Sequence, residues 1–478
     1  MNIRQIDAQT WEIPRSGGMR VPGRVYASPQ MMEVIRKDKS LEQVVNVAHL
    51  PGIVRYSLAM PDIHWGYGFP IGGVCATDST DGVISPGGVG YDINCGVRLV
   101  ATGLQEADVK PRIRQLVKSL FHHVPTGVGA SRAIPKLSKK ELQAVTVQGA
   151  EWAVRRGFGK ESHVDFIEER GCLAEADPES VDARPWQRGA DQLGTLGSGN
   201  HFLEIGRVEE IYHPEAAARF GLRKKGIVVL IHCGSRGFGY QVCDDYLKVT
   251  LRATEKYGIS IPDRQLACAP LRSDEGRAYL GAMRCAANYA FANRQVIMHL
   301  AEQAFGEALG LREGEAGFRL VYDICHNIAK FETHAVDGND MNVCMHRKGA
   351  TRAYGPGHAS LPGMYRDIGQ PVLIPGDMGR YSFLTVGTEK AMQETFGSSC
   401  HGAGRHMSRK KAMKASEGRD MIGELRARGV EIQATGKRTI AEEMPHAYKD
   451  VADVVDVMHD AGITLKVAKF KPIGVIKG

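Results

Sequence analysis

Five short segments of the sequence place side chains that bind metals or attack phosphorus beside glycines or at the ends of expected strands. They are residues 60–96, 193–204, 231–239, 323–334 and 399–412, which include the strings PGGVGYDINCG, LGTLGSGNHFLE, IHCGSRGFG, DICHNIAKFETH and SCHGAGRHMSRKKA. Asp92 and Cys95 lie three residues apart in the first segment, and each segment contains a histidine. One such histidine or cysteine is most often structural, but five segments of this kind together suggest a single shared site.

The chemistry that these residue types suggest is the binding of divalent cations. Thiolate, imidazole and carboxylate together form a site of intermediate softness. A thiolate can bridge two ions, and a pair of metal ions suits in-line attack at phosphorus. The same ligands suit Zn²⁺ as well, so the residue types alone leave the identity of the metal open.

Glycine makes up 56 of the 478 residues, about 12% against an average of roughly 7%. Glycine allows backbone N–H groups to approach phosphate oxygens closely, and Arg236, Arg405 and Arg409 would hold further phosphates. The sequence has no GxxxxGK(S/T) loop, no glycine turn that opens a βαβ unit and no lysine in a KxDG setting. Histidine is therefore the expected nucleophile if the chain forms a covalent nucleotide adduct.

The elements that must position these residues are a mixture of helices and strands without regular βαβ alternation, which predicts an α+β fold. The expected helices are 29–50, 107–124, 141–157, 277–312 (with one possible break), 409–428 and 440–460. The expected strands are short ones within 74–100, then 226–232, 318–324, 370–374 and the tail 464–478. We expect one domain over 1–478, with mixed or antiparallel sheets flanked by helices and a surface insertion at 160–190.

The composition excludes a disordered chain, because 43% of the residues are hydrophobic, and the net charge of +7 permits a polyanionic partner without requiring one. The ten cysteines include no CxxC pair and the N-terminal segment has no apolar stretch. We therefore expect a cytoplasmic protein without disulfides. No apolar run reaches the length of a membrane span, so no membrane partner is expected.

The sequence resembles the RtcB family of RNA-splicing ligases. The matching strings are MPDIHWGYGFPIGGV, GGVGYDINCGVR, LGTLGSGNHFLEI, IHCGSRG, CHNIAK, HRKGATRA, HGAGR and the terminal VIKG, in the family order from about residue 18 to the end. The resemblance implies ligation of a 2′,3′-cyclic phosphate or 3′-phosphate RNA end to a 5′-hydroxyl end, with GTP and two Mn²⁺ ions per active site. It also implies a guanylylated histidine that passes its GMP group to the RNA 3′-phosphate, which the 5′-hydroxyl then attacks.

The resemblance further assigns roles to individual residues. It makes His401 the guanylylated nucleophile and Cys95 a thiolate that bridges two metals, with Asp92 and His201 on one ion and His232 and His326 on the other. The positions implied to hold GTP are Asn200, His201, Phe202, Leu203, Glu204, His326, Asn327, Pro375, Gly376, Asp377, Met378, Ser382, His401, Gly402, Ala403, Gly404, Tyr448 and Lys477. Those implied to hold RNA phosphates are Arg188, Arg236, Arg405 and Arg409.

Two other functions fit parts of the sequence. A metal-dependent RNA cyclic phosphodiesterase or phosphatase needs the metal ligands but leaves His401 and a guanine pocket without a use. An RNA-binding protein with a structural metal fits poorly with open glycine loops. The sequence leaves open the RNA that is joined, the oligomeric state, any dependence on an archease-type activator, and the roles of Asp377 and of 346–353.

Overall fold

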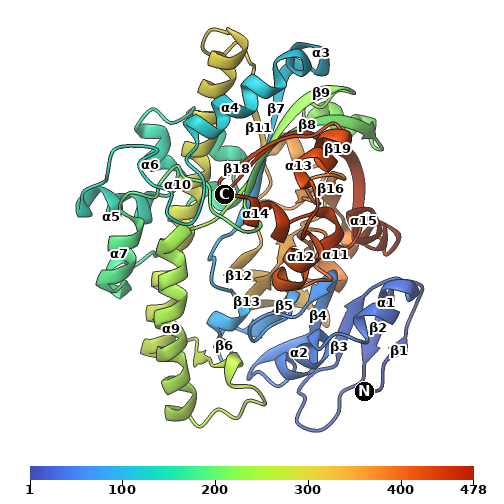
Figure 1. The fold of residues 1–478 in the computed structure, drawn as a ribbon. Coiled ribbons are helices and arrows are strands. Elements are labelled where there is room, and N and C mark those ends of the chain that lie inside the picture. The colour runs from blue at the N-terminus through green and yellow to red at the C-terminus, as the bar shows by residue number, and fades with distance from the viewer.

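Two large mixed β-sheets form the frame of the protein in a computed structural model that describes residues 1–478 (Figure 1). In order across the first sheet, the strands are β1 (Arg4–Gln5), β2 (Thr10–Ile13), β3 (Gly23–Tyr26), β4 (Ile53–His64), β5 (Ile71–Asp78), β13 (Asn339–Lys348) and β12 (Asn327–Val336). The second sheet has the order β11 (Arg319–Cys325), β7 (Gly96–Gln105), β9 (Gly226–Cys233), β8 (Phe202–Ile211), β19 (Thr464–Lys477), β16 (Ser382–Gly387) and β15 (Pro371–Ile374). Only the β3–β4 pair and the pairing of β18 (Glu431–Ala434) with β19 are parallel. The predicted α+β class is therefore confirmed.

Two small ribbons complete the sheet structure. Strand β6 (Val83–Ile84) pairs with β10 (Ala269–Pro270), and β14 (Ala350–Arg352) pairs with β17 (Ser398–Cys400). The second ribbon lies directly before the segment that contains His401 and so fixes where that segment leaves the sheet structure.

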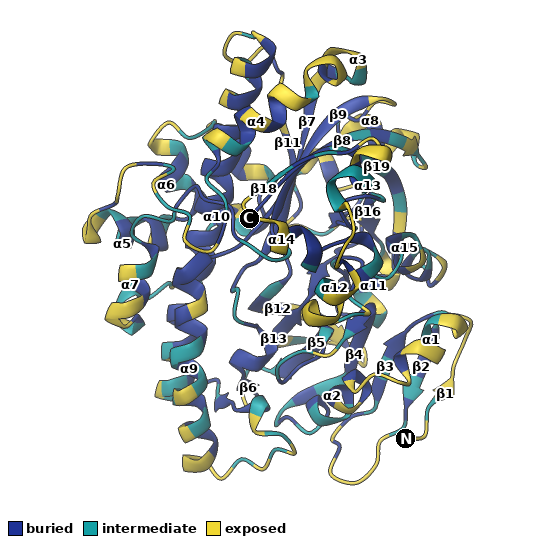
Figure 2. Ribbon diagram, in the orientation of Figure 1, coloured by how far each residue is buried: buried dark blue, intermediate teal, exposed yellow.

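Fifteen α-helices pack around these sheets, and most residues of the longest helix are buried in the protein core. The helices are α1 (Pro29–Ile35), α2 (Ser40–Val47), α3 (Glu106–Val109), α4 (Ile113–His123), α5 (Lys139–Gln148), α6 (Ala150–Arg155), α7 (Ala183–Gly189), α8 (Pro214–Arg219), α9 (Arg236–Lys256), α10 (Asp274–Leu309), α11 (Glu389–Glu394), α12 (Arg409–Ala415), α13 (Met421–Ala427), α14 (Lys437–Glu442) and α15 (Val451–Asp460). Figure 2 shows buried residues along the central strands and through much of α10.

Helix α10 is continuous, although the sequence allowed for one break. The hydroxyl of Ser273 accepts a hydrogen bond from the backbone of Gly276 at its start, and Gly310 ends it in the left-handed conformation. Its buried residues lie all around the helix because α4, α5, α6 and α9 pack against it.

The other predicted helices are shorter than expected, since each of the ranges 29–50, 107–124, 141–157, 409–428 and 440–460 divides into two helices. Several long elements were not predicted at all, among them the strands β4 and β8. The 21-residue helix α9 begins with Arg-Gly-Phe-Gly, which reads as a turn in the sequence, and the strands β12 and β13 form a long hairpin. Tertiary packing overrides the local glycine signal in α9.

The polar segment 160–190 contains three short 3₁₀ helices and α7. Many of its side chains are exposed, but the side chain of Glu168 is buried and pairs with the buried Lys330 of β12. This segment therefore also contributes to the interior of the domain.

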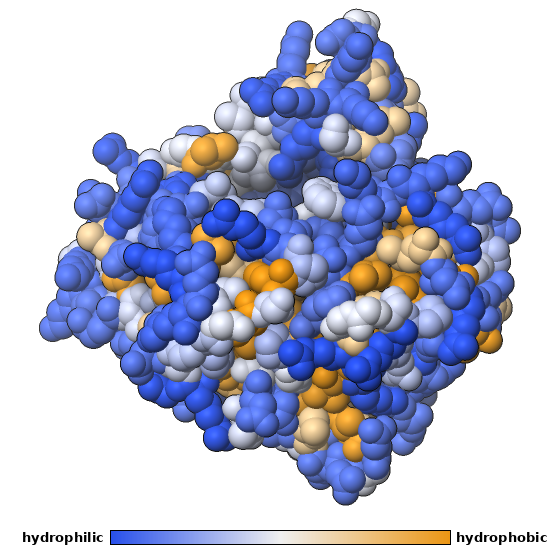
Figure 3. All heavy atoms as spheres, turned by 90° about the horizontal axis from the view of Figure 1, so that it is seen from below, coloured by the Kyte–Doolittle hydropathy of each residue, from blue (hydrophilic) through white to orange (hydrophobic).

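The outer surface is mainly polar. Figure 3 shows a face on which hydrophilic residues predominate and hydrophobic residues gather only in small patches. None of the helices combines the length and the hydropathy that are needed to cross a lipid bilayer.

Candidate metal centre and nucleotide pocket

The five predicted metal ligands lie close together because four neighbouring strands of the second sheet begin or end at the same end of the sheet. Gly96 at the start of β7 pairs with both Cys233 on β9 and Cys325 on β11, and Phe202 at the start of β8 pairs with His232. The antiparallel register thus brings the residues next to these positions, including Cys95, together at one end of the sheet.

The side-chain atoms of these ligands form two groups that share the thiol of Cys95. The first group is Asp92, Cys95 and His201, and the second is Cys95, His232 and His326. The Sγ atom of Cys95 lies 3.3 Å from Nε2 of His201 and 3.2 Å from Nε2 of His232. Nε2 of His201 lies 2.7 Å from Oδ2 of Asp92, and Nε2 of His232 lies 3.3 Å from Nε2 of His326.

This donor set fits a pair of divalent cations that share one sulfur. Three imidazole Nε2 atoms, a thiol and a carboxylate face one another in a largely buried space, and no lysine or arginine takes part in these contacts. Burial, together with the charge of Asp92, raises the pKa of Cys95 to about 12. A bound cation would displace that proton, because the thiolate is the form that ligates metals.

The ligand loops are held from behind by buried polar side chains. Arg294 on α10 donates to the backbone oxygens of Asn94 at 2.8 Å and Cys233 at 2.9 Å, and it pairs with the buried Asp323. The backbone and the hydroxyl of Ser235 donate to Oδ1 of Asp92 at 3.0 and 3.3 Å. These bonds orient Asp92 and fix the chain directly before Cys95.

Gly234 is required at its position because a side chain there would collide with a ligand. A β-carbon on Gly234 would lie 2.3 Å from both carboxylate oxygens of Asp92. This glycine therefore allows the loop after β9 to approach the metal ligands closely.

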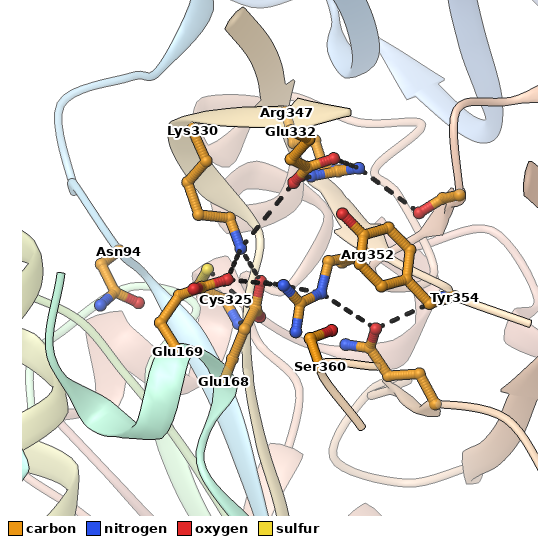
Figure 4. A network of polar contacts seen from close by, with 12 residues as sticks. Asn94, Glu168, Glu169, Cys325, Lys330, Glu332, Arg347, Arg352, Tyr354 and Ser360 are labelled. Atoms are coloured by element: carbon orange, nitrogen blue, oxygen red, sulfur yellow. Dashed lines mark hydrogen bonds and ion pairs between the residues drawn. The ribbon is translucent and has the colours of Figure 1, made fainter. Parts of the chain in front are cut away.

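A second buried network lies on the other side of His326 (Figure 4). Glu168 accepts a hydrogen bond from the backbone N–H of Cys325 at 2.9 Å and pairs with the buried Lys330. Glu169 pairs with Lys330 at 3.0 Å and with Arg352 at 2.5 Å. The segment 160–190 thereby fixes the backbone next to the candidate ligand His326.

The segment HRKGATRA lies inside the protein and braces the site. Nη1 and Nη2 of Arg347 lie 2.5 and 2.8 Å from the carboxylate of Glu332, and Arg352 bonds Glu169. Nζ of Lys348 donates to the backbone oxygen of Gly87 at 3.0 Å, and burial lowers the pKa of this lysine to about 7. The four side chains from His346 to Arg352 that carry nitrogen are all buried, so they support the loops and do not form an open surface.

His401 lies next to the metal ligands and is oriented by an acid that the sequence analysis did not assign. The ring centres of His401 and His326 are 4.7 Å apart. Nδ1 of His401 lies 2.6 Å from Oδ2 of Asp62, which also accepts from the backbone N–H of His401 at 3.1 Å. The carboxylate of Asp62 is fully buried, whereas 13% of the His401 side chain is exposed.

His401 also lines a pocket beside the candidate metal ligands. Of the residues predicted to hold GTP, the pocket is lined by Asn200, Phe202, Glu204, Pro375, Gly376, Asp377, Met378, His401, Gly402, Ala403, Tyr448 and Lys477. His232, Val475 and Glu443 line it as well. The structure thus gathers most of the predicted nucleotide positions around one cavity beside the metal ligands.

The other predicted nucleotide residues lie around this pocket without lining it. Ser382 donates to the Oε1 atom of Glu204 at 3.5 Å, and the Leu203 side chain packs in the hydrophobic core. The Asn327 amide bonds the backbone of Asp92 at 3.1 Å and of Gly349 at 3.0 Å. The remaining members of this group are His201 and His326, which belong to the metal groups, and Gly404, which packs on the backbone of Asp62.

The floor of the pocket contains an acid and a base that are both buried. Burial, together with the charge of Asp377, raises the pKa of Glu204 to about 8. Burial lowers the pKa of Lys477 to about 8, and its Nζ atom lies 3.3 Å from the backbone oxygen of His201. Lys477 is 2% exposed although it is the residue before the last, so it belongs to the pocket and not to a frayed end.

Asp377 has a structural role in the loop that covers the pocket. Its Oδ1 atom accepts from the backbone of Gly379 and Arg380 at 3.0 Å, and its Oδ2 atom pairs with the Arg380 guanidinium. The side chain closes a turn in which Arg380 also donates to the backbone oxygen of Tyr448 at 3.0 Å.

The four predicted RNA-binding arginines lie around the site in different environments. Arg405 lies 3.0 Å from the Tyr448 hydroxyl and 3.2 Å from Glu443, while Arg409 lies 3.4 Å from Glu443 and is half-exposed. Arg236 is buried and donates to Thr195 and to the Gly127 backbone. Arg188 lies 3.2 Å from Gln241.

Sequence reasoning missed two acids of this site, Asp62 and Glu443. Asp62 lies within the quoted string MPDIHWGYG, and its place in that string was the only available signal. Glu443 accepts from the Tyr448 hydroxyl and is 1% exposed. It follows Glu442 at the end of a helix and has no glycine, histidine or cysteine next to it, so no pattern pointed to it.

The comparisons with known proteins agree with this geometry. A family model described as tRNA-splicing ligase RtcB matches residues 43–478. The chain is 52% identical over 478 residues to the tRNA-splicing ligase RtcB of Archaeoglobus fulgidus, and 51% identical over 477 residues to that of Thermococcus kodakarensis. Each alignment covers 100% of this chain and 99% of the relative. The chain therefore belongs to the RtcB family of tRNA-splicing ligases.

Proposed function

We propose that the protein joins an RNA end with a 2′,3′-cyclic phosphate or 3′-phosphate to an RNA end with a 5′-hydroxyl, through a GMP group carried on His401. The observation that carries this proposal is the place of His401 between the metal ligands and the pocket. One edge of its ring contacts Asp62 and its ring lies against His326, and the side chain also lines the cavity.

Asp62 prepares His401 for attack at the α-phosphorus of GTP. An ionised carboxylate only accepts hydrogen bonds, so its contact requires the proton of the neutral imidazole to be on Nδ1. The lone pair then lies on Nε2, since the hydrogen bonds of His401 with Asp62 are made by its backbone N–H and Nδ1. Attack through Nε2 forms the P–N bond, breaks the bond to the β-phosphate and releases pyrophosphate, while Asp62 stabilises the positive ring.

The pocket would hold the guanosine. Guanine donates hydrogen bonds from N1–H and its amino group, and Glu204 would accept them once its carboxyl group is ionised, a form that these donors and the nearby Lys477 favour. Adenine has no matching donors at these positions, so it would leave the buried acceptor unpaired. Ser382, which contacts Glu204, and Lys477 and Tyr448 surround the same region.

The two groups of ligands around Cys95 would hold two Mn²⁺ ions, of which Asp92 and His201 complete one site and His232 and His326 the other. Such ions would neutralise the triphosphate and the charge that develops during phosphoryl transfer. Arg405 and Arg409 at the rim, and Arg188 beyond the metal ligands, would bind the phosphates of the RNA. We place this activity in the cytoplasm and include an archease-type activator among its possible partners.

The experiment that tests the proposal is labelling of the protein with radioactive GTP and Mn²⁺. We expect wild type to gain an acid-labile GMP group and His401→Ala to gain none. His406→Ala is the matched control, because His406 is an exposed histidine of the same loop. Absence of a GMP adduct with every divalent metal, together with opening of cyclic phosphate ends, would support the hydrolase instead.

A further inference from the structure

A row of aromatic side chains leads away from the metal ligands along the glycine-rich loops. Tyr91, directly before Asp92, stacks on Tyr240 with ring centres 5.0 Å apart and ring planes inclined by 25°. Tyr67 meets Tyr91 at an angle of 70° with ring centres 5.7 Å apart, and Cζ of Arg188 lies 5.3 Å from the centre of the Tyr240 ring. We call Tyr67, Tyr91, Tyr240 and Arg188 the aromatic row.

The aromatic row is joined directly to the metal centre. Asp92 follows Tyr91 in the chain and accepts from the backbone of Ser235, and Tyr240 lies in the second turn of the helix that begins after Ser235. A β-carbon on Gly237 would lie 3.0 Å from Nε of Arg188, so Arg188 packs against the first turn of the same helix. Tyr91 is therefore the member of the row next to the candidate metal ligands. The guanidinium group of Arg188 lies at one end of the row.

The row is also open to solvent. The side chain of Tyr240 is 47% exposed, and Tyr67, Tyr91 and Arg188 are partly exposed. Trp65, on the same loop as Tyr67, is 48% exposed. Several aromatic side chains that are partly exposed next to a catalytic centre indicate a binding surface, whereas a single one would not.

Buried side chains hold the row in place before any ligand binds. Lys348 donates to the backbone oxygens of Tyr67 and Gly87 and so ties together the two loops that carry Tyr67 and Tyr91. The Gln43 amide donates to the backbone oxygen of Gly66 at 2.7 Å and fastens the first loop from the other side. A surface that is already ordered loses little conformational entropy on binding.

We propose that the aromatic row is a stacking platform for unpaired bases of the RNA next to the end that reacts. The inference rests on the function proposed above, because it takes the RNA ends to lie at the metal centre. Aromatic rings and a guanidinium plane stack on any base, and the cation adds attraction for the phosphates. Such a platform selects single-stranded ends over paired ends and is indifferent to sequence.

The test measures RNA binding without GTP, so that no reaction occurs. Two single-stranded RNAs carry the fluorescent base 2-aminopurine, one beside a 3′-phosphate and the other beside a 5′-hydroxyl. We expect wild type to quench at least one of them, and Tyr240→Ala to bind that RNA about tenfold more weakly with most of the quenching lost. Tyr240→Phe keeps the ring and should behave as wild type.

Tyr257→Ala is the matched control. Tyr257 follows the same helix, is 40% exposed and makes its hydrogen bond to Glu275 at 3.0 Å away from the row. We expect this variant to bind and quench as wild type. We also expect the wild-type protein to bind RNA with intact bases more tightly than RNA that has abasic sites beside its end.

Three results would overturn the inference: no quenching by wild type, equal binding and quenching by Tyr240→Ala, or equal binding of abasic RNA. Unchanged RNA binding is also the result expected if the row instead contacts a protein partner. Labelling with GTP requires no RNA and is measured in parallel. Its absence in wild type contradicts the proposed function, whereas labelling without base stacking contradicts only the aromatic row.

Discussion

The contact between Asp62 and His401 predicts that Asp62→Asn slows the formation of the GMP adduct. The two side chains lie 2.6 Å apart at Oδ2 and Nδ1, and Asp62 is completely buried. Asparagine has nearly the same shape but can donate from its amide to Nδ1. The ring would then carry its proton on Nε2, where it blocks the lone pair that attacks phosphorus.

The size of the effect follows from two contributions. A hydrogen bond to a charged group contributes about 1.5–3 kcal/mol, and about 1.4 kcal/mol corresponds to a tenfold change in rate. Loss of the charge alone therefore slows labelling about 10- to 100-fold. The wrong tautomer slows it further, since the same replacement behind a catalytic histidine in hydrolases lowers kcat by about 10⁴. We expect a rate between these limits at saturating GTP.

The assay is single-turnover labelling with radioactive GTP and Mn²⁺, followed on denaturing gels. Asp78→Asn serves as the matched control, because Asp78 lies at the end of β5 and is partly exposed. Circular dichroism shows whether each variant is folded. A wild-type labelling rate in a folded Asp62→Asn variant would refute the argument that Asp62 sets the tautomer of His401.

Three further predictions concern the metal centre, the pocket and the buried network. Cys95→Ser should abolish binding of both metal ions, because Cys95 belongs to both ligand groups. Cys172→Ser is the control and should leave metal binding unchanged. Titration with Mn²⁺ followed by electron paramagnetic resonance measures the binding. Burial raises the pKa of Glu204 from 4.5 to about 8, so the folded state holds a proton that the unfolded chain releases, and the free energy of unfolding falls as pH rises through this range. Glu204→Gln should remove that fall, which is at most about 1.4 kcal/mol per pH unit in urea denaturation. Glu168→Gln removes one of the carboxylates that pair with the buried Lys330, while Glu169 remains, and should lower the free energy of unfolding by about 1.5–3 kcal/mol, measured by the same method.

The clustering of the candidate metal ligands could be predicted from the sequence because these residues lie at strand ends beside recognisable motifs. His232 ends a strand of buried apolar residues, and Cys95 precedes another, so the antiparallel register alone brings them together. The acid behind His401 could not be found in this way. Asp62 lies 339 residues from His401 in the chain. The residue types around it and their spacing do not distinguish it from many other acidic residues of the sequence. Its role depends on burial, which the sequence does not reveal.

Glycine has different structural roles in two segments that look alike in the sequence. In 66–96 some glycines lie in the expected turns between short strands, and Gly90 has a φ of +100° directly before Tyr91. In 236–239 the glycines instead begin the helix α9, because the helix needs small residues where it packs closely. A β-carbon on Gly239 would lie 1.9 Å from the Ser235 hydroxyl. The glycines of that turn are therefore explained by packing and not by a bend.

The segment HRKGATRA shows why a strong family motif does not identify a contact with the substrate. The charged side chains of Arg347 and Arg352 are 1% and 3% exposed, and each is paired with a buried or partly buried glutamate. Loss of any member leaves an uncompensated charge in the interior, so these positions tolerate change as poorly as a catalytic residue does. Lys348 shows the same logic, because it holds the loops of the aromatic row from beneath. Arg347, Lys348 and Arg352 direct their charges at buried or partly buried glutamates and backbone oxygens and do not line the pocket, whereas most of the residues proposed to touch the nucleotide do.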